Sequence, residues 1–197
     1  MDALALTFSS GWASGINAYL VVLVLGIADR VADLQQVPDA LGSWPVLIAA
    51  AVLYVWEFVA DKIPYVDSAW DSVSTVIRPT IGAVIGVLLA GEATSLDDAV
   101  GGVVGGGSAL ASHLVKAGNR LALNASPEPV TNVTASGVED LGVLGVVWLA
   151  TEHPVAAAII AAVLLVLGLV VLVLLFRLVR KGWRRWKGKD RPLPAPG

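Results

Sequence analysis

The chain has 197 residues, of which 56% are hydrophobic and only 15% are charged, and its formal net charge is −3. A soluble domain has about 25% charged residues, so this composition excludes a soluble globular protein, which needs more polar surface to cover its core. The chain contains no cysteine, which excludes disulfides, thiol catalysis and thiolate metal sites.

Apolar runs along the chain predict an all-α polytopic membrane helix bundle. The clearest run, residues 154–176, carries no charge. As a helix it reaches about 34 Å, enough to cross a hydrocarbon core of about 30 Å. Pro45 and Pro154 each stand in the first turn of a predicted helix, where proline is tolerated. The six predicted transmembrane helices cover residues 12–30, 44–62, 78–92, 98–123, 135–151 and 153–178.

The first and the fifth predicted helices open with similar sequences. Residues 13–17 read ASGIN and residues 135–139 read ASGVE, and each is followed by a Leu/Val/Gly-rich helix and then a longer apolar helix. This similarity favours an internal repeat of the parallel type. Low sequence complexity produces the same similarity without duplication, so both interpretations stay open.

The basic residues predict the orientation of the chain in the membrane. Eight of the thirteen Lys and Arg residues lie between Arg177 and Arg191. Because Lys and Arg are retained on the cytoplasmic side, the C-terminus is predicted in the cytoplasm, and six crossings return the N-terminus to the same side. We therefore expect a multi-pass protein of the cell (inner) membrane. It would have one transmembrane domain over residues 1–180 and a basic, Pro-rich cytoplasmic tail over residues 181–197.

The second predicted helix ends in a polar segment that is broken at Pro64. Glu57 and Asp61 share one helical face, and ionisable groups in a membrane usually face a bundle interior or a wet cavity. After the break, four apolar residues fall at helical spacing, Val66, Trp70, Val73 and Ile77, and four polar residues fall on the opposite side, Asp67, Asp71, Thr75 and Arg78. This pattern predicts an amphipathic helix between helices two and three that is interfacial or re-entrant. Its polar face is either a solvated surface or the lining of an ion or ligand path.

A second polar stripe runs along the fourth predicted helix. His113, Lys116, Arg120 and Asn124 project within roughly 80° of one another. Long basic side chains near a helix end can extend to the membrane surface, which explains Lys116 and Arg120 but not His113, two to three turns inside the helix. His113 is either a hydrogen-bonded packing residue or a proton carrier.

Together these residues predict one polar cluster on the cytoplasmic half of the bundle. Carboxylates of the fifth helix and an amide of the first lie at a similar depth. Such a cluster is either structural or a transport site that opens when a ligand competes for the paired charges. The candidate ligand-binding or ion-binding residues are Asn17, Glu57, Asp61, Lys62, Asp67, Asp71, Arg78, His113, Lys116, Arg120, Asn124, Glu139 and Asp140.

The chain lacks the recognisable motifs of catalysis. We find no phosphate-binding Gly-rich loop, no zinc-binding His-Glu-x-x-His helix and no Gly-x-Ser-x-Gly nucleophile elbow. We expect no catalytic residue and no cofactor, and the sequence leans away from an enzyme without deciding the question. A metal site is likewise left undecided.

Small residues four apart form helix faces that allow close backbone approach. Gly82 and Gly86 lie on one such face, and Gly101 and Gly105 lie on another. In lipid, packing of such faces drives helix association. The pattern favours tight packing within one chain, with homo-oligomer formation as the alternative.

At several of these positions the sequence resembles a bacterial membrane protein family of unknown function (domain of unknown function 4126). The resemblance rests on residues 14–19, 57–79 and 126–132 together with Glu139 and Asp140, and it covers about residues 5–150. It implies a membrane location and no established activity.

The residues leave three functional hypotheses. The first is a small-solute or ion transporter or channel that uses the polar cluster. The alternatives are a lipid-handling protein, such as a flippase or a headgroup-binding protein, and a membrane scaffold or partner subunit without catalysis. The expected partners are the lipid bilayer and a small polar solute or ion, and nucleic acid is not expected.

Overall fold

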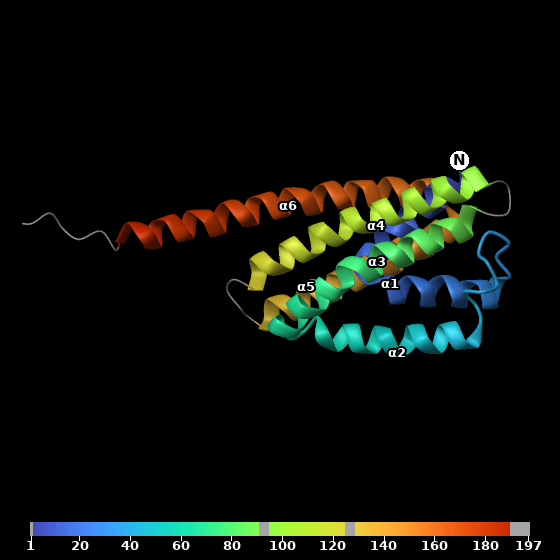
Figure 1. Ribbon diagram of the computed structural model, residues 1–197, viewed down its shortest axis with the longest axis horizontal. Helices are drawn as coiled ribbons and strands as arrows, with labels where there is room; N and C mark the ends of the chain where they lie inside the picture. Colours follow the sequence, from blue (N-terminus) through green and yellow to red (C-terminus); the bar gives the residue numbers. More distant parts are fainter. Residues whose placement is uncertain (1, 91–94, 125–128, 190–197) are drawn as a thin grey trace, which may run out of the picture.

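The computed structural model describes residues 2–90, 95–124 and 129–189, and all regular structure in these ranges is helical. Figure 1 shows the helices packed lengthwise into one bundle, with the last helix extending well beyond the others. The predicted all-α bundle of six helices is confirmed. The helices are α1 (Asp2–Ala32), α2 (Trp44–Ala60), α3 (Pro64–Ala90), α4 (Ser95–Asn124), α5 (Pro129–Glu152) and α6 (Pro154–Lys189).

The outer surface of the bundle is apolar over most of its length. Leu167, Val170 and Leu174 of α6 are each about half exposed, as expected for side chains that face lipid. The helix Trp44–Ala60 is also apolar but shorter than the candidate membrane spans. Among the described residues, four helices are long and apolar enough to cross a membrane by length and composition when α1 is counted as one helix, namely Asp2–Ala32, Tyr65–Ala90, Val133–Glu152 and Pro154–Lys181.

The first helix, α1, is interrupted at Asn17. The backbone of Asn17 has φ −149° and ψ 92°, which is extended rather than helical. Its side-chain Oδ1 accepts a hydrogen bond of 3.0 Å from the backbone N–H of Leu20. This is the geometry of an N-cap, in which a polar side chain satisfies a free N–H of the first helical turn. Asn17 therefore ends one half-helix and begins another.

The first half of α1 runs parallel to α4. Gly11 lies against Gly105 and Ser108, and one turn later Gly15 lies against Ala109 and Ser112. Both helices thus advance in the same direction, which leads the first half of α1 from one end of the bundle to its middle.

The second half of α1 runs back along α5. Asn17 contacts Asp140, and Gln36, just after α1, donates a hydrogen bond to the Thr151 carbonyl near the end of α5. Since Arg120 near the end of α4 pairs with Glu139 in the first half of α5, α5 is antiparallel to α4. The two halves of α1 therefore form a hairpin, and Figure 1 shows both ends of α1 at the same end of the bundle.

This hairpin corrects the predicted continuous crossing by residues 12–30. Each half of α1 has about 15 residues and a length of about 22 Å, which is short of a hydrocarbon core of about 30 Å. The N-terminal residues consequently lie at the opposite end of the bundle from the end of α6 (Figure 1). An unbroken first helix would have placed them at the same end.

The predicted break after the second helix is confirmed between Ala60 and Pro64, and the amphipathic segment that follows is the first half of one long helix, α3. Its polar residues Asp67, Asp71 and Arg78 are buried, whereas its apolar residues such as Val73 and Val76 are exposed. The polar face thus points into the bundle and the apolar face points outward. The interpretation of this segment as a surface helix with solvated carboxylates is therefore wrong.

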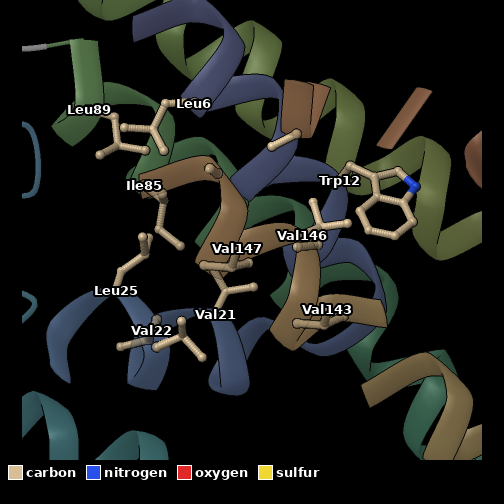
Figure 2. Close-up of a cluster of buried hydrophobic side chains, with 14 of the residues drawn as sticks. Leu6, Trp12, Val21, Val22, Leu25, Ile85, Leu89, Val143, Val146 and Val147 are labelled. Atoms are coloured by element: carbon tan, nitrogen blue, oxygen red, sulfur yellow. The ribbon is translucent and has the colours of Figure 1, made fainter. Parts of the chain in front are cut away.

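An apolar core fills the half of the bundle that holds the α1 hairpin. Leu6 from the first half of α1 and Leu25 from the second half pack in one cluster with Ile85 and Leu89 of α3 (Figure 2). Valines of α5 complete this cluster, among them Val147. Asn17 lies at the inner limit of this core, and the other half of the bundle is polar.

Glycines bring α3 and α4 into backbone contact. A Cβ on Gly86 would meet the Gly101 carbonyl, and one on Gly105 would meet the Gly82 carbonyl. The small-residue faces therefore pack against each other within the chain, as the sequence favours. Gly107, by contrast, has nothing within 4 Å of its Cβ direction.

Candidate functional site

Eight charged side chains meet in the polar half of the bundle and form what we call the charge network. They come from α2, α3, α4, α5 and the segment between α2 and α3. All except Glu139, which is 22% exposed, have side chains that are at most 6% exposed. The members are Glu57, Asp61, Asp67, Asp71, Arg78, Lys116, Arg120 and Glu139.

Arg78 connects α3 with α2, α4 and the end of the first half of α1. Its Nη2 donates to Glu57 Oε1 at 2.6 Å. Its Nη1 donates to His113 Nδ1 at 2.9 Å and to the Gly15 carbonyl at 3.3 Å. Asp71 Oδ1 lies 3.2 Å from the same Nη1. The two η nitrogens of this buried guanidinium are therefore surrounded by acceptors, whereas its Nε has no hydrogen-bond partner among the described residues.

Lys116 lies one turn further along α4 from His113 and has a similar set of partners. Its Nζ donates to Asp61 Oδ2 and to the Ile16 carbonyl, both at 2.9 Å. Glu57 Oε1 and Glu139 Oε2 each lie 3.7 Å from this nitrogen. Lys116 thus links α1, α2 and α5 to α4.

Arg120 is the third cation of the network. Its Nη2 donates to Glu139 Oε2 at 2.6 Å, and its Nε donates to the other carboxylate oxygen at 3.4 Å. Its Nη1 donates to the Asp61 carbonyl at 3.0 Å and lies 3.6 Å from Asp67 Oδ1. Two-point contact of this kind fixes the geometry of a carboxylate.

The network contains more acids than bases. Among the described residues, five carboxylates share three cations. Glu57 Oε2 and Asp61 Oδ1 are buried and accept no hydrogen bond, and the same holds for both oxygens of Asp71. A buried charge without full compensation is costly. The arrangement therefore has the capacity to take up positive charge.

The end of the first half of α1 is built into the network. A helix end leaves carbonyl groups without helical partners and carries a partial negative charge. The carbonyls of Gly15 and Ile16 are satisfied by Arg78 and Lys116. Asn17 Nδ2 donates to Asp140 Oδ1 at 2.9 Å. The break in α1 and the charge network thus form one structure.

His113 takes part as a neutral ring. Arginine can only donate hydrogen bonds, so the contact of Arg78 with His113 Nδ1 makes that nitrogen an acceptor. The proton is then on Nε2, which lies 3.0 Å from Thr75 Oγ1. Thr75 in turn donates to the Asp71 carbonyl at 2.9 Å. His113 of α4 therefore connects two residues of α3, Arg78 and Thr75, through hydrogen bonds to its two ring nitrogens.

The structure brings most of the predicted site residues together, but Lys62 is an exception. Its Nζ donates to the Phe58 carbonyl at 2.8 Å and lies over the Phe58 ring, and it forms no ion pair with the network among the described residues. The side chain of Asn124 lies outside the described residues. The backbone carbonyls of Gly15 and Ile16 belong to the site but were not among its predicted groups. The signal that could have found them is Asn17, a good helix-capping residue inside an apolar helix.

Two cavities adjoin the network. One, of about 130 Å³, is lined by Trp12, Lys116, Asn119 and Glu139 together with α6. The other, of about 160 Å³, lies between α3 and α4 and includes Asp71. Within the described part of the chain, no group of three or more His, Cys, Asp or Glu residues is suited to hold a metal ion.

A helix bundle with an apolar outer surface and charged residues collected in its interior defines a polytopic α-helical membrane protein. The chain belongs to the family described as domain of unknown function 4126, whose sequence profile matches residues 4–174. This confirms the resemblance and extends it beyond residues 5–150 into α6. No curated protein and no solved structure gave a match. The family description states no activity, so the function has to be argued from the site.

Proposed function

We propose that the protein is a small-solute or ion transporter or channel, and that the charge network binds its cargo or coupling ion. The observation that carries this proposal is the excess of carboxylates over cations in the charge network, five against three among the described residues, at the end of a broken helix. The excess favours a cation as the bound species.

The interrupted helix supports this proposal. Discontinuous helices in transporters place half-helix ends near the middle of the membrane, where freed backbone groups help to bind ions. Here the free carbonyls of Gly15 and Ile16 are held by Arg78 and Lys116. A cation that neutralises Glu57 or Asp61 would weaken the ion pairs of these carboxylates with Arg78 and Lys116. Ion binding and the position of the half-helix would thus be coupled.

The basic end of α6 supports an orientation for this model. Arg177, Arg180, Lys181 and Arg184 follow the apolar run directly, and basic residues are retained on the cytoplasmic side. On this proposal the charge network occupies the cytoplasmic half of the bundle in the cell (inner) membrane. The α1 hairpin would then lie in the outer half, with the N-terminal residues outside rather than in the cytoplasm.

Reconstitution into liposomes tests the proposal. A valinomycin-induced K⁺ diffusion potential, negative inside, drives cations inward. An internal pH-sensitive dye reports protons, and isotope counting reports Na⁺. We expect cation uptake by the wild type and its loss in Glu57→Gln and Asp61→Asn, because each removes a carboxylate of the network. Glu152→Gln, which changes an exposed carboxylate at the end of α5, serves as the matched control.

The fold of each variant is checked by gel filtration and by thermal unfolding in detergent. Uptake that is unchanged in both folded variants would contradict the proposal. In that case the network has a structural role, as in a scaffold or partner subunit.

A lipid-handling function is the second candidate, and α6 supports it. Its four basic residues line one face with a groove of about 330 Å³, and basic clusters directly after a transmembrane helix attract anionic lipid headgroups. Nanodiscs with and without phosphatidylglycerol test this. A thermal stabilisation by anionic lipid that is lost in Arg180→Gln with Arg184→Gln would favour headgroup binding.

A further inference from the structure

The cavity between α3 and α4 has a regular polar wall. Ser68, Asp71, Ser72 and Thr75 stand at i, i+3, i+4 and i+7 and therefore share one face of α3. The opposite wall is Ala117 and Leu121 of α4. The cavity begins about one turn from the start of α3, at the end of the bundle where the chain passes from α2 to α3 (Figure 1). The polar side chains lie on one wall only, and a cavity of about 160 Å³ has room for several water molecules along that wall.

Asp71 is the charged residue in this wall, and its carboxylate lacks hydrogen bonds. The residue is only 5% exposed, and neither carboxylate oxygen accepts a hydrogen bond from the described residues. Arg78 Nη1 is 3.2 Å from Oδ1, but this nitrogen carries two hydrogens. Both are directed to other acceptors, His113 Nδ1 and the Gly15 carbonyl. The Asp71 carboxylate is therefore close to the Arg78 guanidinium but accepts no hydrogen bond from it.

The charged groups that act on Asp71 come from three parts of the chain. Arg78 belongs to α3 itself, and Lys116 and Arg120 belong to α4. Asp61 acts from the segment between α2 and α3. His113 of α4 is directed to Thr75 and Arg78, and α1 contributes the Gly15 carbonyl to Arg78. Since the three cations also serve Glu57, Asp61 and Glu139, they do not fully compensate Asp71.

We propose that Asp71 reversibly binds a proton delivered through this cavity, and that this proton is the coupling ion or cargo of the transporter. A proton needs one carboxylate oxygen, whereas a metal cation needs several ligands and would sit beside the Arg78 guanidinium. Protonation converts the carboxylate to an acid that donates its own hydrogen bond into the cavity. It also reduces the excess of negative charge in the network by one. No oxidation or bond cleavage accompanies this step.

The role of the proton in transport rests on the proposed function, but its binding to Asp71 can be measured without transport. Infrared difference spectra of the whole protein in nanodiscs, recorded between high and low pH, detect the carbonyl stretch of a buried protonated carboxyl group. We expect this band in the wild type and its loss in Asp71→Asn. Asp39→Asn, which changes an exposed carboxylate in the loop before α2, should keep the band.

Asp71→Glu keeps an acid at this position and serves as the second variant in case Asp71→Asn does not fold. It should retain a carboxyl band at a shifted frequency. A band that is the same in wild type, Asp71→Asn and Asp71→Glu would overturn the proposal, because another carboxyl group would then hold the proton. Absence of any such band in the wild type would overturn it as well.

The choice of a proton over a metal cation is tested in the same samples. Spectra are recorded at one fixed high pH, first in an organic salt and then in NaCl or KCl. We expect the frequency of the Asp71 carboxylate band to be the same in all three salts. A carboxylate shift caused by Na⁺ or K⁺ that disappears in Asp71→Asn would overturn the proton assignment in favour of a metal cation.

The infrared and flux results together separate this inference from the proposed function. A band that depends on Asp71 in a protein without any cation uptake would support proton binding and contradict transport. Proton uptake that persists in folded Asp71→Asn would leave transport standing and contradict the role of Asp71.

Discussion

At the scale of single residues, Asn17 has two tasks that few side chains can combine. Its Oδ1 caps the second half of α1 through the Leu20 N–H, and its Nδ2 donates to Asp140. The side chain is only 1% exposed, so water cannot replace either contact. The amide group matches this position because it is donor and acceptor at once.

We therefore predict that Asn17→Ala lowers the free energy of unfolding by about 1–3 kcal/mol, because it removes an N-cap and deprives the partly buried Asp140 carboxylate of one hydrogen-bond donor. Asn17→Ser keeps a capping oxygen and should cost less. Denaturant unfolding in a mild detergent, followed by circular dichroism, measures both. Equal stability of Asn17→Ala and the wild type would show that the break does not depend on the cap.

Each cation of the charge network contacts several carboxylates, so its contribution cannot be assigned to one ion pair. Arg78 touches Glu57, Asp71 and His113, and Lys116 reaches carboxylates on three elements. Removal of one base leaves several buried carboxylates uncompensated at once. Substitutions of neighbouring network members should therefore not be additive.

At the scale of elements, the contact of α3 with α4 depends on which glycines lie in it. A Cβ on Gly105 would meet the Gly82 carbonyl and the Gly86 Cα, whereas one on Gly107 would meet nothing within 4 Å. The two glycines lie on the same helix, two residues apart, so they form a matched pair.

We predict opposite effects for alanine at these two positions. Gly105→Ala should destabilise the protein by about 1–3 kcal/mol, because the backbones must separate to admit the methyl group. Gly107→Ala should be neutral or stabilising by up to about 1 kcal/mol, because alanine favours the helix. Thermal unfolding of both variants decides this. Equal destabilisation by both would contradict the close α3–α4 contact.

At the scale of the whole molecule, the α1 hairpin divides the bundle into two halves. The apolar core with Leu25 and Ile85 fills the half that holds the hairpin, and the charge network fills the other. The two halves of α1 meet at Asn17, which lies beside the charge network. The hairpin leaves the start of α1 and the end of α6 at opposite ends of the bundle (Figure 1).

Cysteine labelling in intact cells tests this arrangement, and the chain has no native cysteine to interfere. Single cysteines at exposed Leu4, Asp39 and Lys181 report on the N-terminal end, the loop before α2 and the end of α6. We predict that a membrane-impermeant maleimide labels Leu4→Cys and Asp39→Cys from one side and Lys181→Cys only from the other. Labelling of Leu4→Cys and Lys181→Cys from the same side would contradict the hairpin.

Sequence periodicity predicted much of this structure because the membrane restricts the alternatives. Apolar runs of sufficient length have to become helices, since lipid offers no hydrogen bonds to the backbone. Polar residues at helical spacing, such as Asp67, Asp71 and Arg78, have to face inward, since lipid does not solvate charge. The residues of the candidate site follow from these two constraints.

The polypeptide sequence by itself thus determined the six helices, the break after α2 and the residues available to the polar cluster. Only the tertiary structure decided that α1 turns back at Asn17, that α3 continues through Pro79, and which acid pairs with which base. The break needs the cations of α3 and α4 to satisfy the carbonyls of Gly15 and Ile16. Such partners lie far away in sequence, and local periodicity carries no information about them.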